Sequence, residues 1–442
     1  MRAAVVALSD LGRSPRMHYH AHALASNGVD VDLVGYEGTP LPRRVIDNPR
    51  INVHRFQALT KRFRQTASLP YAIVATIEAI QLSFRLWRLL RTLDRPDLVL
   101  VQNPPAFPTL LVTSWSLRRR GTRFVIDWHN VGYTLLQRRL GRWHPAVRLS
   151  RWMERRDARR ADAHLCVSRG LASFLNVKWN IPGARVLYDR PASVFAPMDR
   201  SERERFRLAL FGRMGLVGET YGFIICPSSW TEDEDFDVVI DAVLRLEDRI
   251  RGWEGADPRR RFVSLIVLVT GDGARRAEFE RRFAGLPARR VFLRTRWLEP
   301  EEYPRVVGSA DLGLCLHRSS SGLDIPIKIA DLFGAGVPVC ALDYGAALAE
   351  RVRHGDSGLI VSTARQLADV LFDLFETYPA EQPLLERLRL GARRSARPTW
   401  EEGWSRDARE LLLGNRGVGS EGAGAAVARE SRADDAAVGG RS

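Results

Sequence analysis

The chain has 442 residues, of which 45% are hydrophobic and 27% charged, a composition typical of a globular protein with two or three domains. It excludes a wholly disordered chain, a collagen-like repeat and a polytopic membrane protein. Lysine and arginine total 67 against 52 aspartate and glutamate residues, so the formal net charge is +15. This excess favours anionic partners: phosphates, nucleic acid or an anionic bilayer surface.

Cysteine usage and hydrophobicity predict a cytosolic protein without a membrane span. The four cysteines stand at 166, 226, 315 and 340, too far apart for zinc-binding pairs, and each lies in an apolar run that favours a buried, reduced thiol. The first residues have too short an apolar stretch for a signal peptide or an anchor, and charges interrupt the apolar segment 71–90. Any membrane contact is therefore predicted to be peripheral, at the cytosolic face.

Short apolar runs alternate with helical segments along the chain, which predicts parallel sheets covered on both faces. In the first half the predicted strands are 3–8, 31–34, 52–55, 98–101, 122–126, 164–167 and 185–187, and the helices include 16–26, 72–91 and 146–161. In the second half the strands are 222–226, 262–269, 290–293, 312–316, 337–341 and 358–361, and the helices include 235–246, 274–283, 301–308, 327–333 and 364–376.

The predicted fold class is α/β, with two doubly wound, Rossmann-like domains in tandem. The first domain covers 1–190 and the second 218–398, joined by a linker, 191–217, that has two prolines, a charge run and no strand signal. Residues 399–413 are predicted to form one last helix, and residues 414–442, dominated by Gly, Ala, Ser and balanced charge, a disordered tail. Such domains bind ligands at the carboxyl ends of their strands, so the site is expected in the cleft between them.

The loop after the first predicted strand has the features of a phosphate site. Gly12 permits a tight turn, and Ser14 is a good N-cap for the helix that follows. Arg13 and Arg16 stand beside the N-terminus of that helix, where an anion is favoured. An ordinary capped turn with surface arginines is the alternative.

Another strand ends in Asp127, Trp128, His129 and Asn130, at the edge where a doubly wound domain places its site. Asp127 or His129 can take a proton, since a histidine with a nearby carboxylate is a common general base. Trp128 can stack on the face of a sugar. A structural histidine, hydrogen-bonded in the cleft, is the alternative.

Residues 138–160 hold nine arginines against two acidic residues, Glu154 and Asp157. Trp143, Leu149 and Trp152 are interleaved with them. A basic amphipathic helix with tryptophan is typical of a membrane-surface element. The alternative is a solvated helix with an arginine-rich face.

Two loops of the second half follow strands and are suited to a nucleotide. The first contains Ser229, Trp230 and Thr231. The second contains Gly271, Asp272 and Gly273, a glycine-rich turn that brings backbone N–H groups close to a diphosphate. The Gly-Asp-Gly string alone is a weak signal.

A third loop, 317–326, is polar and precedes a short helix with Lys328 and Asp331. Lys328 is one of only three lysines in the chain, and a compact ammonium group is a good phosphate ligand. Asp331 lies three residues later on the same helix face, where a carboxylate can accept two hydrogen bonds from a ribose diol. A salt bridge between these two side chains is the alternative.

Several longer strings resemble one family in order and register: DLGRSPRM, QNPP (102–105), VIDWHN, YDRPAS (188–193), SSWTEDEDF (228–236), WLEPEEYP (297–304), GSADLGLCLHRSSSGLDIPIKIADLFG (308–334) and VPVCAL. The chain resembles the chitobiosyldiphosphodolichol β-1,4-mannosyltransferases, GT-B glycosyltransferases of lipid-linked oligosaccharide synthesis. That family adds mannose from GDP-mannose to a lipid diphosphate-linked acceptor. The bare N-terminus, where eukaryotic members begin with a membrane anchor, and the arginine bias point to a bacterial relative.

The resemblance implies a site residue by residue. The donor GDP-mannose is expected against Ser229, Trp230, Thr231, Gly271, Asp272, Gly273, Trp297, His317, Ser319, Ser320, Ser321, Gly322, Lys328 and Asp331. The lipid diphosphate-linked, GlcNAc-containing acceptor is expected against Gly12, Arg13, Ser14, Arg16, Asn103, Trp128 and Asn130. Other glycosyltransferases of the same pathway are further candidate partners.

The motif also bears on stereochemistry. Retaining GT-B enzymes of the related large group carry two Glu eight positions apart before a Gly-x-Pro; here Asp331 takes the second position and Leu323 the first. The loss of the first acid favours inversion, a single displacement that converts an α-linked donor into a β-mannoside. That reaction needs a base, for which Asp10, Asp127 and His129 are the candidates, and cationic groups for the departing diphosphate, with no metal expected.

Three other functions compete with this reading. A glycosyltransferase of the same fold with another nucleotide sugar or a soluble acceptor is the nearest. A nucleic-acid-binding protein would fit the charge, but the sequence has no recognisable binding motif and this function is not expected. A catalytically silent sugar-nucleotide binder would bind GDP without turnover.

Overall fold

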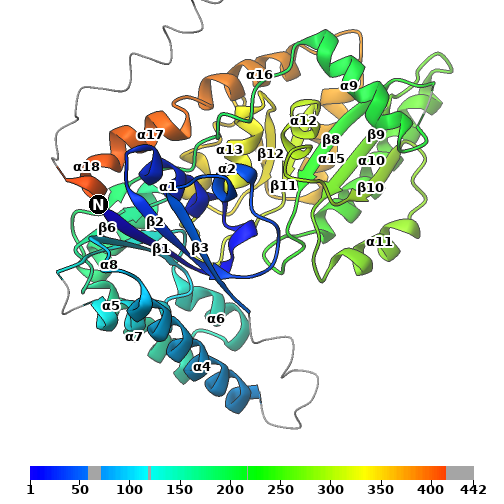
Figure 1. Ribbon diagram of the computed structural model, residues 1–442. Helices are drawn as coiled ribbons and strands as arrows, with labels where there is room; N and C mark the ends of the chain where they lie inside the picture. The colour runs from blue at the N-terminus through cyan, green and yellow to red at the C-terminus, as the bar shows by residue number, and fades with distance from the viewer. Residues whose placement is uncertain (58–70, 118–120, 217, 415–442) are drawn as a thin grey trace, which may run out of the picture.

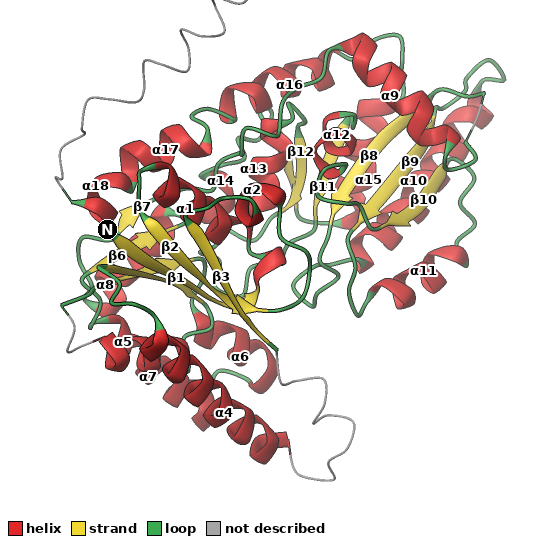
Figure 2. Ribbon diagram, viewed as in Figure 1, coloured by secondary structure: helices red, strands yellow, loops and turns green. Residues whose placement is uncertain are grey.

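The computed structural model describes residues 1–57, 71–117, 121–216 and 218–414. Two parallel sheets, each covered by helices on both faces, form two domains (Figures 1 and 2). Residues of both domains line the cavities of a cleft between them. This is the predicted fold class.

The first sheet has the strand order β3-β2-β1-β4-β5-β6-β7, and every pairing is parallel. Its strands are β1 (Arg2–Asp10), β2 (Asp30–Tyr36), β3 (Ile51–Phe56), β4 (Leu98–Asn103), β5 (Arg123–Trp128), β6 (Ala163–Cys166) and β7 (Arg185–Val186). The helices around it are α1 (Pro15–Ser26), α2 (Arg43–Ile46), α4 (Tyr71–Thr92), α5 (Thr109–Leu117), α6 (Gly132–Leu140), α7 (Pro145–Ala158) and α8 (Arg169–Trp179), with a 3-10 turn at Leu11–Arg13. Central strands are buried on both faces, which explains their unbroken apolar runs.

The second sheet has the order β10-β9-β8-β11-β12-β13 and is also parallel. Its strands are β8 (Tyr221–Pro227), β9 (Ser264–Thr270), β10 (Val291–Arg296), β11 (Leu312–Cys315), β12 (Val339–Leu342) and β13 (Gly358–Val361). Its helices are α10 (Asp237–Ala256), α11 (Arg276–Ala284), α12 (Tyr303–Gly308), α13 (Ile327–Gly334), α14 (Ala346–Ala349), α15 (Ala364–Phe375) and α16 (Pro383–Ser395).

The predicted elements correspond to observed ones, with some differences. The segment predicted as a linker contains a helix, α9 (Arg200–Gly212), whose N-cap Asp199 accepts a hydrogen bond from the backbone of Glu202. The helix predicted at 146–161 ends at Ala158, and the one at 235–246 continues to Ala256. The predicted tail lies outside the described residues beyond Gly414.

The end of the described chain returns to the first domain. Instead of one helix over 399–413 there are two, α17 (Trp400–Asp407), capped by Thr399, and α18 (Arg409–Leu413). Figure 1 shows α17, coloured orange-red, beside the blue α1. The Trp404 indole Nε1 donates to His20 Nδ1 at 3.0 Å, so the last helices tie the domains together.

All four cysteines are buried free thiols, as predicted. None of the helices in the described ranges is long and apolar enough to cross a membrane.

Candidate active site

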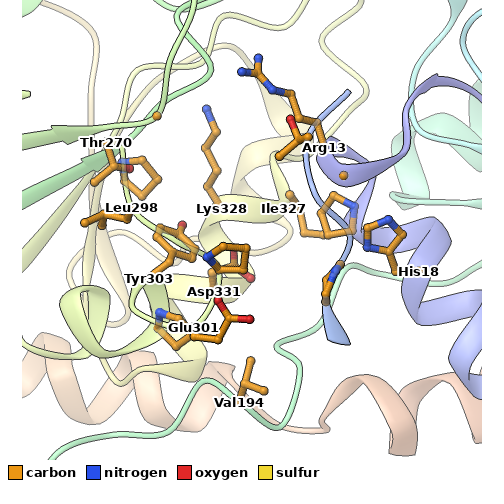
Figure 3. A pocket seen from close by; sticks show the side chains of 18 of the residues that line it. Arg13, His18, Val194, Thr270, Leu298, Glu301, Tyr303, Ile327, Lys328 and Asp331 are labelled. Atoms are coloured by element: carbon orange, nitrogen blue, oxygen red, sulfur yellow. The ribbon is translucent and has the colours of Figure 1, made fainter. Parts of the chain in front are cut away.

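Two adjoining cavities lie in the cleft, and loops that follow strands of both sheets line them. The larger, of about 680 Å³, is bounded in the second domain by Ser229, Gly271, Trp297, Lys328 and Asp331 (Figure 3). The smaller, of about 280 Å³, lies between His129 of the first domain and His317 of the second. Arg13, Pro15 and Ile327 line both cavities, so one elongated ligand can occupy the two together.

On the first-domain side of the smaller cavity, His129 lines the wall and contacts the buried Asp127. Asp127 is fully buried and accepts from Arg16 through both oxygens, at 2.7 and 2.8 Å. Its Oδ2 also lies 3.0 Å from His129 Nε2. His129 follows β5 directly and is 26% exposed toward the cavity. When Nε2–H donates to Asp127, Nδ1 carries the lone pair that can receive a proton.

Electrostatics separate the roles of these two groups. Although burial opposes ionisation, the Arg16 guanidinium and His129 hold the pKa of Asp127 well below its usual value. A carboxylate that stays ionised and has no exposed surface cannot serve as a proton acceptor for a substrate. Asp127 therefore orients His129, and His129 is the base candidate that reaches the cavity.

The guanidinium group of Arg16 forms hydrogen bonds within the protein. Its guanidinium is 2% exposed, and besides Asp127 it donates to the Leu187 carbonyl and to Asp189 at 2.9 and 2.8 Å. Arg16 therefore has a structural role, and since part of its surface lines the smaller cavity, its contact with the acceptor stays a prediction.

Two other predicted acceptor residues lie in the core. Trp128 is fully buried, packs on Trp179 and donates from Nε1 to His164 at 3.0 Å, so the prediction that it stacks on a sugar is wrong. Successive side chains of a strand point to opposite faces, and this sheet is covered on both. Asn103 is likewise buried and donates to Glu154 and the Asn130 carbonyl.

Most of the predicted site residues in the loop after β1 stabilise the loop itself, and one of them extends into the cleft. Asp10 accepts from the backbone N–H groups of Gly12 and Thr39 and from the Thr39 hydroxyl, so it organises the loop. A Cβ at Gly12 would lie 2.4 Å from the Thr39 carbonyl oxygen, which explains the glycine. The Ser14 hydroxyl bonds to the Asp10 carbonyl. Arg13 alone reaches across the cleft, donating to the Asp272 carbonyl at 3.2 Å.

The loop after β8 is organised by Glu234, a residue that sequence reasoning missed. Its buried carboxylate accepts from the Ser228 hydroxyl at 2.8 Å and from the backbone of Ser229 and Thr231 at 3.0 and 3.3 Å. It also pairs with Lys328. An acidic residue five positions after a serine-rich turn is the only signal the sequence offers.

Trp230 and the glycine-rich turn pack against one another. Trp230 is 1% exposed, stacks on Phe236 with ring centroids 4.5 Å apart and donates from Nε1 to the Gly271 carbonyl. Gly271 has φ +92°, and a Cβ there would lie 2.0 Å from the Ser228 carbonyl oxygen; at Gly273 it would lie 2.4 Å from that of Ser229. The indole of Trp230 is thus part of the scaffold, while the two loops present their backbones.

Lys328 and Asp331 lie on α13 and line the larger cavity, and they do not form the salt bridge considered as the alternative. Burial opposes the charge of Lys328, but its ion pair with Glu234 raises its pKa, so the ammonium group stays charged. Figure 3 shows Lys328 and Arg13 extending toward the same end of the cavity from its two sides. The first turn of α13 has no side-chain cap, so its N–H groups add positive potential at that end.

Asp331 lies deeper and is buried. Burial, with a smaller contribution from the Asp189 charge, raises the pKa of Asp331 to about 8. Its Oδ1 is buried and has no hydrogen-bond partner. Trp297, at the cavity edge, is 38% exposed, and the Arg13 guanidinium lies 5.9 Å from its ring centroid.

His317 lies between two carboxylates on the second-domain side of the smaller cavity. Nδ1 is 3.2 Å from Asp233 and Nε2 is 2.7 Å from Asp324. Burial opposes protonation, but these hydrogen bonds raise the pKa of His317 to about 9, so it carries a positive charge at neutral pH. Ser319 bonds to the same Asp324 carboxylate.

The rest of the serine loop contacts the first domain. The Ser321 hydroxyl donates to Asn130 Oδ1 at 2.6 Å, and the Ser320 hydroxyl lies 3.2 Å from Asn130 Nδ2 and 2.8 Å from the Thr134 hydroxyl. Gly322 turns the loop with φ +75°. Predicted donor and acceptor residues are therefore paired with each other here and close the cleft.

Comparisons with known proteins agree with this geometry. Residues 12–188 match the model of the Glycosyl transferase 4-like domain. The chain is 36% identical to the UDP-glycosyltransferase TURAN of Arabidopsis thaliana, covering 93% of this chain and 97% of that protein. It is 36% identical to the chitobiosyldiphosphodolichol beta-mannosyltransferase of Yarrowia lipolytica, covering 91% and 84%, and 32% identical to that of Homo sapiens, covering 92% of each.

Solved structures agree on the fold. The sucrose-phosphate synthase of Thermosynechococcus elongatus superposes with a TM-score of 0.65 at 14% identity, covering 98% of this chain and all of that one. Anabaena HepE in complex with UDP gives 0.57 at 13% identity, covering 90% and 94%. The sequence relationships are closer and extend over both domains. The chain thus belongs to the chitobiosyldiphosphodolichol beta-mannosyltransferase family of GT-B glycosyltransferases.

Proposed function

We propose that this glycosyltransferase transfers mannose from GDP-mannose to a GlcNAc-containing, lipid diphosphate-linked acceptor with inversion, forming a β-1,4-mannoside. The names of the relatives support the acceptor class and the sugar. The observation that carries the mechanism is His129, held by the ionised Asp127 at the edge of a cavity that joins the cationic end of the nucleotide site.

In this proposal the nucleotide occupies the larger cavity. Asp331 accepts from the ribose hydroxyls through its unpartnered Oδ1. Arg13, Lys328 and the first turn of α13 contact the diphosphate, and the mannose enters the smaller cavity. These cationic groups stabilise the charge that develops as the glycosidic bond breaks, so the reaction needs no metal.

The chemical step is one displacement. The acceptor hydroxyl oxygen forms a bond to mannose C1 while the bond from C1 to the diphosphate oxygen breaks. His129 Nδ1 receives the hydroxyl proton, and GDP leaves with the bonding electron pair. Asp127 stabilises the resulting imidazolium, as the buried carboxylate does in other histidine-base systems.

Retaining relatives have an acidic residue at the position of Leu323, and its absence here favours inversion. The Leu323 carbonyl accepts from the Ser168 hydroxyl, and the Leu323 side chain contacts the first domain. The adjacent Asp324 is bound to His317 and Ser319, so its carboxylate is paired with a cation. Neither group stabilises an oxocarbenium ion as the free carboxylate of a retaining site would.

The deciding experiment is a turnover assay with GDP-mannose and a lipid diphosphate-linked chitobiose, with and without a chelator. Proton NMR of the product is expected to show a β-mannoside, and the chelator is expected to leave the rate unchanged. His129→Ala is expected to lower the rate by about 10²- to 10⁴-fold without loss of donor binding. An α-linked product, or near-normal activity of His129→Ala, would contradict the mechanism.

A UDP-sugar donor is the second candidate, because the relative from Arabidopsis thaliana is named a UDP-glycosyltransferase. A competition assay separates the two donors: GDP is expected to inhibit at lower concentration than UDP. The reverse order would replace the donor while leaving the GT-B mechanism in place.

A further inference from the structure

Exposed apolar side chains are concentrated on one part of the first domain. Of the sixteen large apolar residues exposed among the described residues, nine lie between α4 and α7. They include three tryptophans, at 64%, 76% and 56% exposure. The nine are Ile80, Phe84, Phe107, Trp115, Leu135, Leu140, Trp143, Leu149 and Trp152.

Seven of these side chains belong to one layer of helices, and Phe107 and Trp143 lie in loops that adjoin it. α4 contacts α5, α5 contacts α7, and α7 contacts α6, and together they cover one face of the first sheet (Figure 2). Trp87 joins α4 to α5, with ring centroids 5.7 Å from Phe84 and 6.3 Å from Trp115. Exposed side chains of this layer point away from the sheet, and we call their outer surface the α4–α7 face.

From α6 to α7, the exposed charge of this face has one sign. In the fully described segment 132–160 every exposed charged side chain is an arginine, whereas the two acidic residues, Glu154 and Asp157, are buried. Guanidinium groups lie over exposed rings: Arg142 is 4.6 Å from the Trp143 centroid. Tryptophan and arginine side by side fit the interface of an anionic bilayer, where the ring enters the headgroup region and the cation meets lipid phosphate.

The face is continuous with the cleft through α6. Leu135 and Arg138, near the start and middle of α6, line the smaller cavity, and Arg138 donates to the Glu232 carbonyl of the second domain at 3.0 Å. Leu140 ends the same helix on the exposed face. A third cavity, of about 730 Å³, adjoins α6 and is lined by four arginines, Arg13, Arg138, Arg139 and Arg275, together with Glu232, which pairs with Arg139, and Asp233.

From this arrangement we propose that the α4–α7 face docks on an anionic lipid bilayer and so sets the mouth of the cleft, along α6, at the membrane surface. The assignment of a lipid-linked acceptor to this cleft rests on the proposed function. The docking surface itself does not, because it can be measured without donor or acceptor.

The contacts and the exposure of each arginine determine which residues are exchanged in the test. Arg159 donates to the Trp179 carbonyl and Arg156 pairs with Asp157, so both hold the fold and are left unchanged. Arg142, Arg148 and Arg151 are exposed, and their triple exchange to Glu forms the charge variant. Trp143→Ser with Trp152→Ser forms the apolar variant.

Matched controls lie on the second domain and on other helices. Arg245, Arg251 and Arg259 are exposed, and their exchange to Glu gives the same change in net charge away from the face. Leu208→Ser with Leu390→Ser removes two exposed apolar side chains elsewhere.

The full chain is sedimented with vesicles of phosphatidylcholine, with and without phosphatidylglycerol. The wild-type protein and both controls are expected to bind the anionic vesicles. The charge variant is expected to lose about 100-fold in partition coefficient and the apolar variant at least about tenfold. Both variants are expected to keep turnover on a water-soluble acceptor with a short alkyl chain.

Two results would overturn the docking proposal: variants that bind anionic vesicles like the wild type, and a wild-type dimer in solution that the apolar variant converts to a monomer. Vesicle binding without turnover on any acceptor would refute the proposed function and leave the docking surface standing.

Discussion

At the scale of single residues, four ion pairs determine what the site can do. Arg16 keeps Asp127 ionised, Glu234 holds Lys328, and two carboxylates keep His317 charged. Lys328 and His317 face the cavities from positions that their carboxylate partners fix, and Asp127 lies behind His129. Electrostatic catalysis depends on such fixed charges, because they need not reorganise during the reaction.

Lys328→Ala is expected to lower turnover by about 10²- to 10³-fold, because the diphosphate loses a preorganised cation. Glu234 keeps its bonds to Ser228, Ser229 and Thr231, so the fold is expected to persist. Steady-state kinetics and thermal melting measure the two effects. Lys178→Ala, at an exposed position on α8, is the control, and equal activity of the two variants would refute the assigned role.

Asp331 is expected to make stability depend on pH. Its pKa is raised from 3.8 to about 8, so the folded state favours the protonated carboxyl. The stabilising contribution is complete below about pH 4 and is lost as the pH rises toward 8, with a slope of at most about 1.4 kcal/mol per pH unit.

Asp331→Asn stays neutral throughout this range. The melting temperature of the wild type, relative to that of the variant, is therefore expected to fall between pH 4 and 8. Parallel melting curves across this range would show that the carboxyl is already ionised in the folded protein.

At the scale of elements, the two donor loops are built backbone against backbone. Gly271→Ala is expected to displace the loop after β8, since its Cβ would meet the Ser228 carbonyl oxygen, and thereby to weaken GDP binding at least about tenfold. Calorimetry measures the affinity. Gly252→Ala, in α10 with no atom within 4 Å of the new Cβ, is expected to leave binding intact and stabilise the helix by about 0.5–1 kcal/mol. Unchanged binding by Gly271→Ala would count against this loop as part of the donor site.

The strands and the edge that carries the site follow from periodicity, because parallel sheets buried on both faces need apolar runs of fixed length. The role of each side chain at that edge does not follow from periodicity. Trp128 and Asp127 are neighbours in sequence, yet one packs in the core and the other holds His129. Glu234 pairs with Lys328 across 94 positions, and no local pattern predicts a partner so distant.

At the scale of the whole molecule, the returning helix α17 completes the first domain. Trp404 donates to His20 Nδ1, and His20 Nε2 lies 3.2 Å from the same Asp127 oxygen that contacts His129. Burial lowers the pKa of His20, so a neutral ring accepts this bond. Trp404, near the end of the described chain, thus supports His129 through His20 and Asp127.

Trp404→Phe keeps the ring and removes the donor. Turnover is expected to fall about fivefold to tenfold, the cost of one buried hydrogen bond, with little change in melting temperature. Trp253→Phe, which packs on Phe372 in the second domain, is the control. A loss of melting temperature without loss of turnover would limit Trp404 to packing.

The position of Trp404 has a consequence for biosynthesis. A nascent chain emerges from the ribosome with the whole first sheet long before residue 404 has been added, and domains fold as they emerge. Until α17 leaves the exit tunnel, His20 lacks the hydrogen bond from Trp404, whereas Asp127 already has Arg16 and His129 as partners. The hydrogen bond behind the base candidate therefore forms last, and a product truncated before residue 404 keeps the contacts of Arg16, Asp127 and His129 but lacks this support.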